Sequence, residues 1–500
     1  MAPTPGTGVG TGVSRGERGT SARRLWVVVL AACAGQFLVV LDVSVVNVAL
    51  PSMRTDLEMS AAGLQWVLNA YTLTFAGFML LGGRAADIFG RKRMFLLGLA
   101  LFTAASLAGG FAQQPWQLLA ARGLQGMGAA VLAPATLTIL TTSFPQGRAR
   151  TRAIATWTAV GAGGGAAGGL VGGVLTGALS WRWVLLINVP IGALVLAAAA
   201  LRVTEARDRT VARRRLDMPG ALLVTAGLGT LAWGIVQTES VGWTGASALV
   251  PLAAGLALLA LFVLVEARTA APLVPLGLLR LRSVSATNAA MFVCGSAMFC
   301  MWYFMSLYMQ NVLHYTPVQA GLGFIPQSLS VVLGSKAAPR LMARLGARTV
   351  ALTGVLISCA GCLWQSGMHA GGGFLTTVLG PGVMMALGAG LAGTPLASIA
   401  MSGVPHGDAG LVSGLVNTSR TMGGSLGLAV LSTVATARIG NGDSPATLAA
   451  GYGLAFRCGA GILMLCAILI LLALPRAERE PGHDPSEEQE ERAVADAVGS

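Results

Sequence analysis

Two side chains that could carry proton chemistry stand in otherwise apolar stretches of this sequence. Asp42 interrupts the run LVVLDVSVVNVALP, and Arg122 opens the stretch RGLQGMGAA. A charge at hydrocarbon depth costs about 2.5–3.5 kcal/mol on insertion scales, so a buried carboxylate favours a nearby cation and a buried guanidinium favours a nearby carboxylate. Two interpretations stay open. The residues form either a purely structural ion pair or a titratable pair, in which proton binding to Asp42 frees Arg122 for other partners.

The elements that carry these residues are expected to be membrane-spanning helices. The chain has 54% hydrophobic and 11% charged residues and a mean hydropathy of +0.70, whereas a soluble domain carries roughly 25% charged residues. Apolar runs of about 20 residues predict spanning helices. We predict fourteen of them, at residues 25–50, 62–82, 94–112, 117–140, 153–178, 184–201, 217–237, 247–265, 286–309, 318–335, 349–368, 373–401, 410–436 and 449–474.

The basic residues indicate the orientation of these helices. With the N-terminus in the cytoplasm, 27 of the 33 Lys and Arg fall on the cytoplasmic side, three fall outside and three lie within helices. This bias follows the positive-inside rule, so we expect both termini to be cytoplasmic and the chain to sit in the cell membrane. Topology then explains the net charge of +13, and nucleic-acid binding is not expected. Asp42 and Arg122 lie roughly 13 Å and 9 Å below the outer surface, at nearly matching depths.

The predicted architecture is an all-α polytopic membrane protein with two six-helix halves and an inserted helix pair. A basic segment separates the first half from two helices that are poor in polar residues, and biased, polar composition predicts disorder at both ends. The expected divisions are a disordered tail at 1–24, an N-terminal half at 25–201, a cytoplasmic basic loop at 202–216, the inserted pair at 217–265, a C-terminal half at 266–474 and an acidic disordered tail at 475–500.

Enzymatic chemistry has no support in the sequence. It contains no G-x-x-x-x-G-K-[ST] phosphate-binding loop and no Ser/His/Asp or Cys/His constellation at a plausible site. Cys359 and Cys362 have a metal-like spacing, but in an apolar helix without partner ligands we interpret them as small core residues. We therefore expect that the protein is not an enzyme, that it has no metal site and no cofactor, and that it does not use ATP. An ion gradient would have to drive any uphill movement.

The loop after the second predicted helix begins at Gly83 and reads GRAADIFGRKR. A cluster that only sets topology explains Arg91 and Lys92, but it does not explain Asp87 or the two glycines. Asp87 and Arg91 are four residues apart and can pair on a helix, while Gly90 permits a tight turn between two helices. The pattern G-x-x-x-D-x-x-G-R-K resembles the cytoplasmic signature of the major facilitator superfamily. That resemblance implies a charge clasp that stabilises one access state of a carrier.

Further segments narrow the resemblance. RGLQGMGAA resembles the R-x-x-Q-G element of the same superfamily, and the remaining motifs are LDVSVVNVALP at 41–51, WRWVLLINVPIG at 181–192 and LVSGLVNTSRTMGGSLG at 411–427. Together with fourteen helices, they resemble the drug:proton antiporter-2 family. The resemblance covers all predicted helices and implies a fourteen-helix major facilitator fold that exports drugs or antibiotics in exchange for protons. An incomplete copy of the loop motif at 339–348 has Ala343 where the aspartate would be.

The fifth predicted helix carries a ridge of glycines, which recur at every fourth position from 161 to 177. Such a ridge removes side chains from one stripe and lets another backbone approach closely. The segment resembles the antiporter signature G-P-x-x-G-G, with Gly169 where the family usually has proline. Because proline is the residue that would kink the helix, its replacement weakens the expectation of a kink. The expectation of close packing is unchanged. The expected helix-packing residues are Gly161, Gly165, Gly168, Gly169, Gly172 and Gly173.

Polar and flexible side chains on several helices are candidates for lining a substrate cavity. Met298, Trp302 and Met305 form a stripe at helical spacing that suits an adaptable drug pocket, and a lipid-facing or packing surface is an equally open interpretation. Asp42 is the only clear acid at hydrocarbon depth, and one acid cannot easily serve both a proton and a dication. We therefore expect hydrophobic neutral, weakly acidic or monocationic substrates. The candidate cavity residues are Gln36, Asn47, Gln125, Met298, Trp302, Met305, Asn417 and Arg420.

These observations favour a carrier that exports amphipathic drugs or antibiotics across the cytoplasmic membrane in exchange for protons. Its expected partners are small substrates, protons and the lipid bilayer; a monomer is sufficient, and the sequence does not give the oligomeric state. Two alternatives stay open. One is proton-coupled export or uptake of a metabolite, and the other is a membrane sensor or scaffold that transports nothing.

Overall fold

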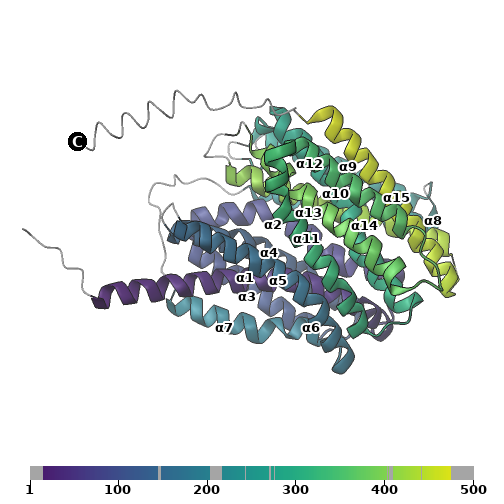
Figure 1. Ribbon diagram of the computed structural model, residues 1–500, viewed down its shortest axis with the longest axis horizontal. Helices are drawn as coiled ribbons and strands as arrows, with labels where there is room; N and C mark the ends of the chain where they lie inside the picture. The colour runs from purple at the N-terminus through teal and green to yellow at the C-terminus, as the bar shows by residue number, and fades with distance from the viewer. Residues whose placement is uncertain are drawn as a thin grey trace, which may run out of the picture.

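The computed structural model describes residues 15–144, 148–202, 217–242, 244–269, 272–274, 276–402, 404, 409–440 and 442–474, and for some of the helical residues, residues 15–25 and Asp87 among them, it describes the backbone alone. Within these ranges the regular structure is wholly helical. Figure 1 shows the N-terminal helices, purple to blue, along one side of the molecule and the C-terminal helices, green to yellow, along the other. The predicted basic loop and acidic tail lie almost wholly outside the described residues.

The N-terminal half begins with a helix that is longer than its apolar core. α1 starts at Arg15, so the predicted disordered tail is wrong for 15–24, where the helix continues beyond the apolar run into a charged segment. The predicted sixth helix is broken in two near Ile187. The helices of this half are α1 (Arg15–Asp56), α2 (Ala61–Phe89), α3 (Arg91–Gly110), α4 (Pro115–Ser143), α5 (Arg148–Ala178), α6 (Trp183–Leu186) and α7 (Asn188–Arg202).

The inserted pair is a helical hairpin of α8 (Met218–Val241) and α9 (Ala246–Arg268). α8 covers the seam between the halves, because its Leu228 and Ala232 pack in one cluster with Leu73 of α2 and Ala429 of α14 (Ala409–Ile439). Two buried acids lie near the ends of this pair, in addition to the one acid expected from the sequence. Asp217 accepts a hydrogen bond from the Gly220 amide at 2.9 Å, and Glu266 accepts one from the Val274 amide at 3.1 Å.

The C-terminal half repeats the plan of the first. Its loop-motif copy makes the same turn, because Gly346 has φ 80° between two helices as Gly90 has φ 103° between α2 and α3. Only glycine adopts such backbone angles without strain. The elements are η1 (Leu278–Arg280), α10 (Arg282–Leu307), the π-helix η2 (Tyr308–Val312), α11 (Pro317–Leu345), α12 (Ala347–Gln365), the π-helix η3 (Leu375–Leu379), α13 (Gly380–Met401), α14 and α15 (Pro445–Ala473).

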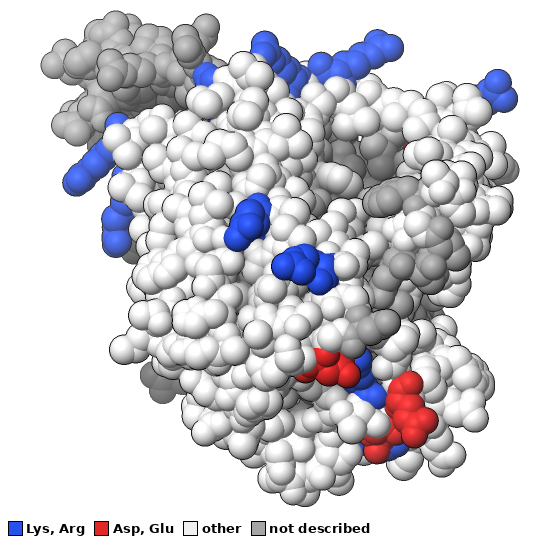
Figure 2. Space-filling model, turned by 90° about the vertical axis from the view of Figure 1, so that its right-hand side faces the viewer, with Lys and Arg blue, Asp and Glu red and all other residues white. Residues whose placement is uncertain are grey.

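Thirteen helices among the described residues are long and apolar enough to cross a membrane. The one predicted span that is not among them is 318–335, which lies in the 29-residue helix α11 and is less apolar because Gln319 and Gln327 interrupt it. Figure 2 shows one side of the molecule, where the broad surface between a basic upper edge and a lower edge with acidic groups is uncharged apart from two basic groups. Such a surface is suited to the hydrocarbon core of a bilayer.

The two halves meet along two side seams and at one end. α5 packs against α11 along one seam, α2 packs against α14 along the other, and α1 contacts α10 near Asn47. At that end the Ser306 hydroxyl donates to the Asn47 backbone carbonyl at 2.7 Å, and the Gln310 side-chain amide donates from Nε2 to the Val48 backbone carbonyl at 2.9 Å. The halves are therefore joined by hydrogen bonds at the end of α1 that follows Asp42.

Candidate proton-coupling site

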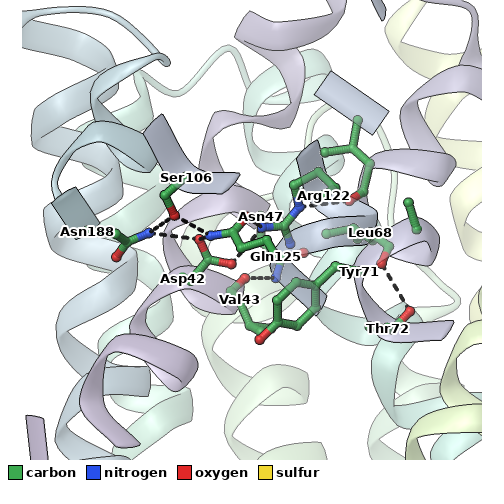
Figure 3. Close-up of polar contacts among 12 residues, drawn as sticks. Asp42, Val43, Asn47, Leu68, Tyr71, Thr72, Ser106, Arg122, Gln125 and Asn188 are labelled. Carbon is green, nitrogen blue, oxygen red and sulfur yellow. Dashed lines mark hydrogen bonds and ion pairs between the residues drawn. The ribbon is translucent and has the colours of Figure 1, made fainter. Parts of the chain in front are cut away.

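Asp42 is held by three side chains in the interior of the N-terminal half (Figure 3). One carboxylate oxygen accepts from Arg122 Nη1 at 2.6 Å. The other accepts from Gln125 Nε2 at 2.6 Å and from Asn188 Nδ2 at 2.9 Å. The Asp42 side chain is 0% exposed. A buried carboxylate needs such charge-assisted hydrogen bonds to stay ionised, and these three donors supply them.

Arg122 is as deeply buried as its partner, with 1% of its side chain exposed. Besides Asp42, it donates from Nη1 to Gln125 Oε1 at 2.7 Å and from Nε to the Val67 carbonyl at 3.1 Å. Its guanidinium carbon also lies 4.4 Å from the centre of the Tyr71 ring, a cation–π contact. The arginine therefore keeps three neighbours that do not depend on the charge of Asp42.

Five helices bring this group together, α2 among them through Val67 and Tyr71. α1 carries Asp42, and α4 carries Arg122 and Gln125 three residues apart, which places both on one helix face. α3 contributes Ser106, whose hydroxyl accepts from Gln125 Nε2 at 2.7 Å and from Asn188 Nδ2 at 3.3 Å. Asn188 is the first residue of α7, directly after the break between α6 and α7. The break lets a side chain from the sixth spanning segment enter the group.

Sequence reasoning named Asp42 and Arg122 for this group, and the structure brings them into direct contact. It placed Gln125 among the substrate-cavity residues, whereas the side chain is 1% exposed and binds Asp42. It missed Asn188, Ser106 and Tyr71. A signal existed for Asn188, because an amide in the apolar stretch WVLLINVP needs a buried partner; single Ser and Tyr residues gave none.

The loop-motif residues lie at the junction of α2 and α3. Gly90 makes the predicted tight turn, and Lys92 Nζ donates to the Ala200 carbonyl at 2.9 Å. Gly83 lies on α2 beside Pro134 of α4. Arg91 begins α3, but the Asp87 side chain lies outside the described residues, so the clasp between the two stays a prediction.

The glycine ridge of α5 packs on two helices at once. Carbon atoms added at Gly168 and Gly172 would overlap or crowd Ser44 and Val45 of α1, and one at Gly161 would lie 3.3 Å from the Gln36 side chain. Gly165 has more room. The other side of α5 faces α11.

On that side, a carbon atom added at Gly169 would lie 3.0 Å from the Gly321 carbonyl, and one at Gly173 would overlap the Pro317 carbonyl. Gly169 occupies the position where the family motif has proline. A proline ring at this point would run into α11, so the departure from the motif fits the close contact between the two halves.

The remaining cavity candidates differ in exposure. Met305 is fully buried and belongs to the packed core, while Met298 and Trp302 are half-buried, with the Trp302 ring 5.0 Å from that of Phe324. Asn47 is buried beside Ser306.

Gln36 and Asn417 are half-buried as well, and Arg420 is the one exposed member of the candidate set. Met305 and Gln125 are thus closed off in this conformation, whereas Arg420 is accessible to solvent.

Comparisons with known proteins agree with this architecture. Residues 32–428 match the Major Facilitator Superfamily. The chain is 49% identical over 470 residues to a cephamycin export protein of Amycolatopsis lactamdurans, with 94% of this chain and 96% of that protein covered. It is 38% identical over 467 residues to a puromycin resistance protein of Streptomyces alboniger, with 90% and 92% covered.

Solved structures show the same fold at low sequence identity. An auto-inhibited peptide transporter of the POT family superposes with a TM-score of 0.67 at 17% identity, covering 93% of this chain and 99% of that one. A bacterial homologue of the lysosomal transporter Spinster superposes with a TM-score of 0.66 at 16% identity, covering 89% and 96%. The chain belongs to the Major Facilitator Superfamily and is a multi-pass membrane transporter, not an enzyme.

Proposed function

We propose that this transporter exports amphipathic antibiotics across the cytoplasmic membrane in exchange for protons, with both termini in the cytoplasm. The relatives named for cephamycin export and puromycin resistance, which align over at least nine-tenths of this chain, support antibiotic export. The distribution of 27 of 33 basic residues supports the orientation. One chain contains both halves and the whole Asp42 group, so a monomer is sufficient.

The observation that carries proton coupling is the Asp42 group itself. It places a carboxylate with 0% exposure among membrane-spanning helices, where the charge is stable only through Arg122 and two amide donors. Protonation of Asp42 removes the negative charge that holds Arg122 and the two amide donors in this arrangement. Arg122 then stays with the Val67 carbonyl and the Tyr71 ring, so neutralising Asp42 leaves the cation with partners.

α1 connects this group to the other half. Asn47 follows Asp42 by about 7.5 Å of helix, and its carbonyl accepts the hydrogen bond from Ser306 of α10. A shift of α1 when Asp42 binds or releases a proton would act directly on this contact between the halves. The cycle follows from this link: a proton from outside binds Asp42, Arg122 loses the carboxylate as a partner, the substrate is released, and the halves rock back.

The test is concentrative uptake of a cephamycin into inverted membrane vesicles that hold an acid-inside pH gradient. We expect the wild type to accumulate the drug and an ionophore that collapses the gradient to abolish accumulation. Asp42→Asn keeps the shape of the side chain but cannot take up a proton, and we expect it to abolish accumulation as well.

Asp56→Asn is the matched control. Asp56 ends α1 and pairs with Arg182 at 2.7 Å, but both side chains are partly exposed, so the pair is worth little and transport should continue. Accumulation by Asp42→Asn at the wild-type level, in vesicles with equal amounts of protein, would refute coupling through Asp42. Uptake that ignores the ionophore would refute proton coupling altogether.

A further inference from the structure

Arg420 carries a positive charge deep within the C-terminal half. It follows Ala409, the first residue of α14, by about 16 Å of helix, which places it near mid-membrane depth. Arg122, the buried arginine of the other half, has Asp42 as counter-ion. Among the side chains that the structure describes, no carboxylate forms an ion pair with Arg420.

Arg420 faces the interior of the transporter and not the lipid. α14 has no exposed large hydrophobic side chain among its described residues, unlike α15, where Leu465, Ile468 and Leu472 are exposed. Helices that face lipid must show such side chains, so α14 is an interior helix. Arg420 is nevertheless exposed although protein surrounds it. Its guanidinium therefore lies in a solvent-accessible part of the interior.

The packing of α14 indicates the direction in which Arg420 points. Gly423 and Gly427 lie against α10, Ser425 donates to Asn69 of α2 at 2.9 Å, and Met422 packs with α8 on the outside of the seam. At about 100° per residue, position 420 falls between the directions of α10 and α2, on the side opposite α8. On that side α14 faces α2 of the N-terminal half.

An apolar surface of α10 lies beside Arg420. A carbon atom added at Gly295 would overlap the Arg420 carbonyl, so the two helices touch at this point. Met298 and Trp302 follow Gly295 by three and seven residues, which places all three on one face of α10. Both side chains are half-buried. Met298 and Trp302 thus lie on the face of α10 that includes the contact with α14 at Arg420, and both keep part of their surface accessible.

We propose that Arg420, Met298 and Trp302 form a binding site for amphipathic substrates that carry a carboxylate. The guanidinium would take the carboxylate in a bidentate pair, and Met298 and Trp302 would cover the apolar body. The two arginines therefore have different roles. Arg122 is paired with Asp42 at the proton site, whereas Arg420 pairs with no carboxylate among the described side chains and is available to the substrate. This inference rests on the proposed export function and narrows its substrate class.

The experiment compares a cephamycin, which carries a carboxylate, with its methyl ester as substrates for uptake into energised inverted vesicles. In the wild type we expect half-saturation by the acid at a concentration about tenfold below that of the ester, the gain from one charge-assisted hydrogen bond. Arg420→Gln should remove this difference by weakening the acid alone. Arg420→Lys, which keeps the charge, should restore part of it.

The matched control is Arg457→Gln, because Arg457 is an exposed arginine in the middle of α15, on the same face as the lipid-exposed Met464 and Ile468. It should change neither substrate. Uptake of the ester by Arg420→Gln at the wild-type rate shows that the variant is folded. Equal half-saturation by acid and ester in the wild type, or equal losses for both in Arg420→Gln, would overturn the carboxylate site while leaving drug export intact. A wild type that concentrates neither compound would refute the export function, and this site with it.

Discussion

At the scale of single residues, the geometry around Arg122 matters as much as its charge. The guanidinium donates in three directions, to Asp42, to Gln125 and to the Val67 carbonyl. A lysine has the charge but not the planar fork that makes these bonds together. We expect Arg122→Lys to lower the rate of proton-driven uptake by at least about tenfold, since misplacing one buried charged hydrogen bond costs roughly 1.5–3 kcal/mol.

Arg182→Lys provides the comparison for this substitution. Arg182 is partly exposed and pairs with Asp56, so lysine should serve there with little loss. Uptake by Arg122→Lys that matches Arg182→Lys would contradict the argument, because charge alone would then be enough.

The sequence predicted the two charged members of this group and not its neutral ones. Asp42 and Arg122 stand out because a charge in an apolar run is costly and demands a partner at the same depth. Ser106 and Tyr71 are common in spanning helices, and their role depends on which face meets which neighbour. Helix spacing alone does not determine those contacts.

At the scale of helices, the contact between α5 and α11 depends on glycine. A methyl group at Gly173 would overlap the Pro317 carbonyl and crowd Val318, so the two halves would have to separate at this seam. We expect Gly173→Ala to destabilise the protein by about 1–3 kcal/mol, the usual cost of overpacking. Thermal unfolding of the purified protein would show this as a lower midpoint, and vesicle uptake should fall with it.

Gly163→Ala tests whether any change on α5 has the same effect. A methyl group at Gly163 meets no atom within 4 Å, so alanine should be neutral or slightly stabilising. A Gly173→Ala protein as stable and active as Gly163→Ala would show that the close approach is not needed.

Sequence periodicity predicted the helices well and their breaks poorly. Apolar runs placed all thirteen spanning helices found among the described residues, but the interruption before Asn188 and the π-helices at Tyr308–Val312 and Leu375–Leu379 depend on tertiary contacts. The glycine register predicted close packing on α5. It did not reveal that the ridge serves two partners, α1 and α11, because periodicity identifies a stripe and not what covers it.

At the scale of the whole molecule, the two halves form one carrier that is joined near Asn47 and Ser306. The composition, the two six-helix halves and the superfamily motifs made this architecture predictable from the sequence. The conformation was not predictable, because access states of a carrier differ by only a few kcal/mol, spread over many contacts. The exposure of Arg420 therefore emerges only from the assembled structure.

The most direct measurement of the central claim is the movement of protons itself. A pH-sensitive dye inside acid-loaded inverted vesicles would report proton exit when a cephamycin is added outside. With wild-type protein we expect the internal pH to rise on addition of the drug, and with Asp56→Asn we expect the same rise. With Asp42→Asn the internal pH should stay constant, because the variant has no carboxylate to carry the proton. A drug-induced rise in Asp42→Asn vesicles equal to that of the wild type would contradict the account.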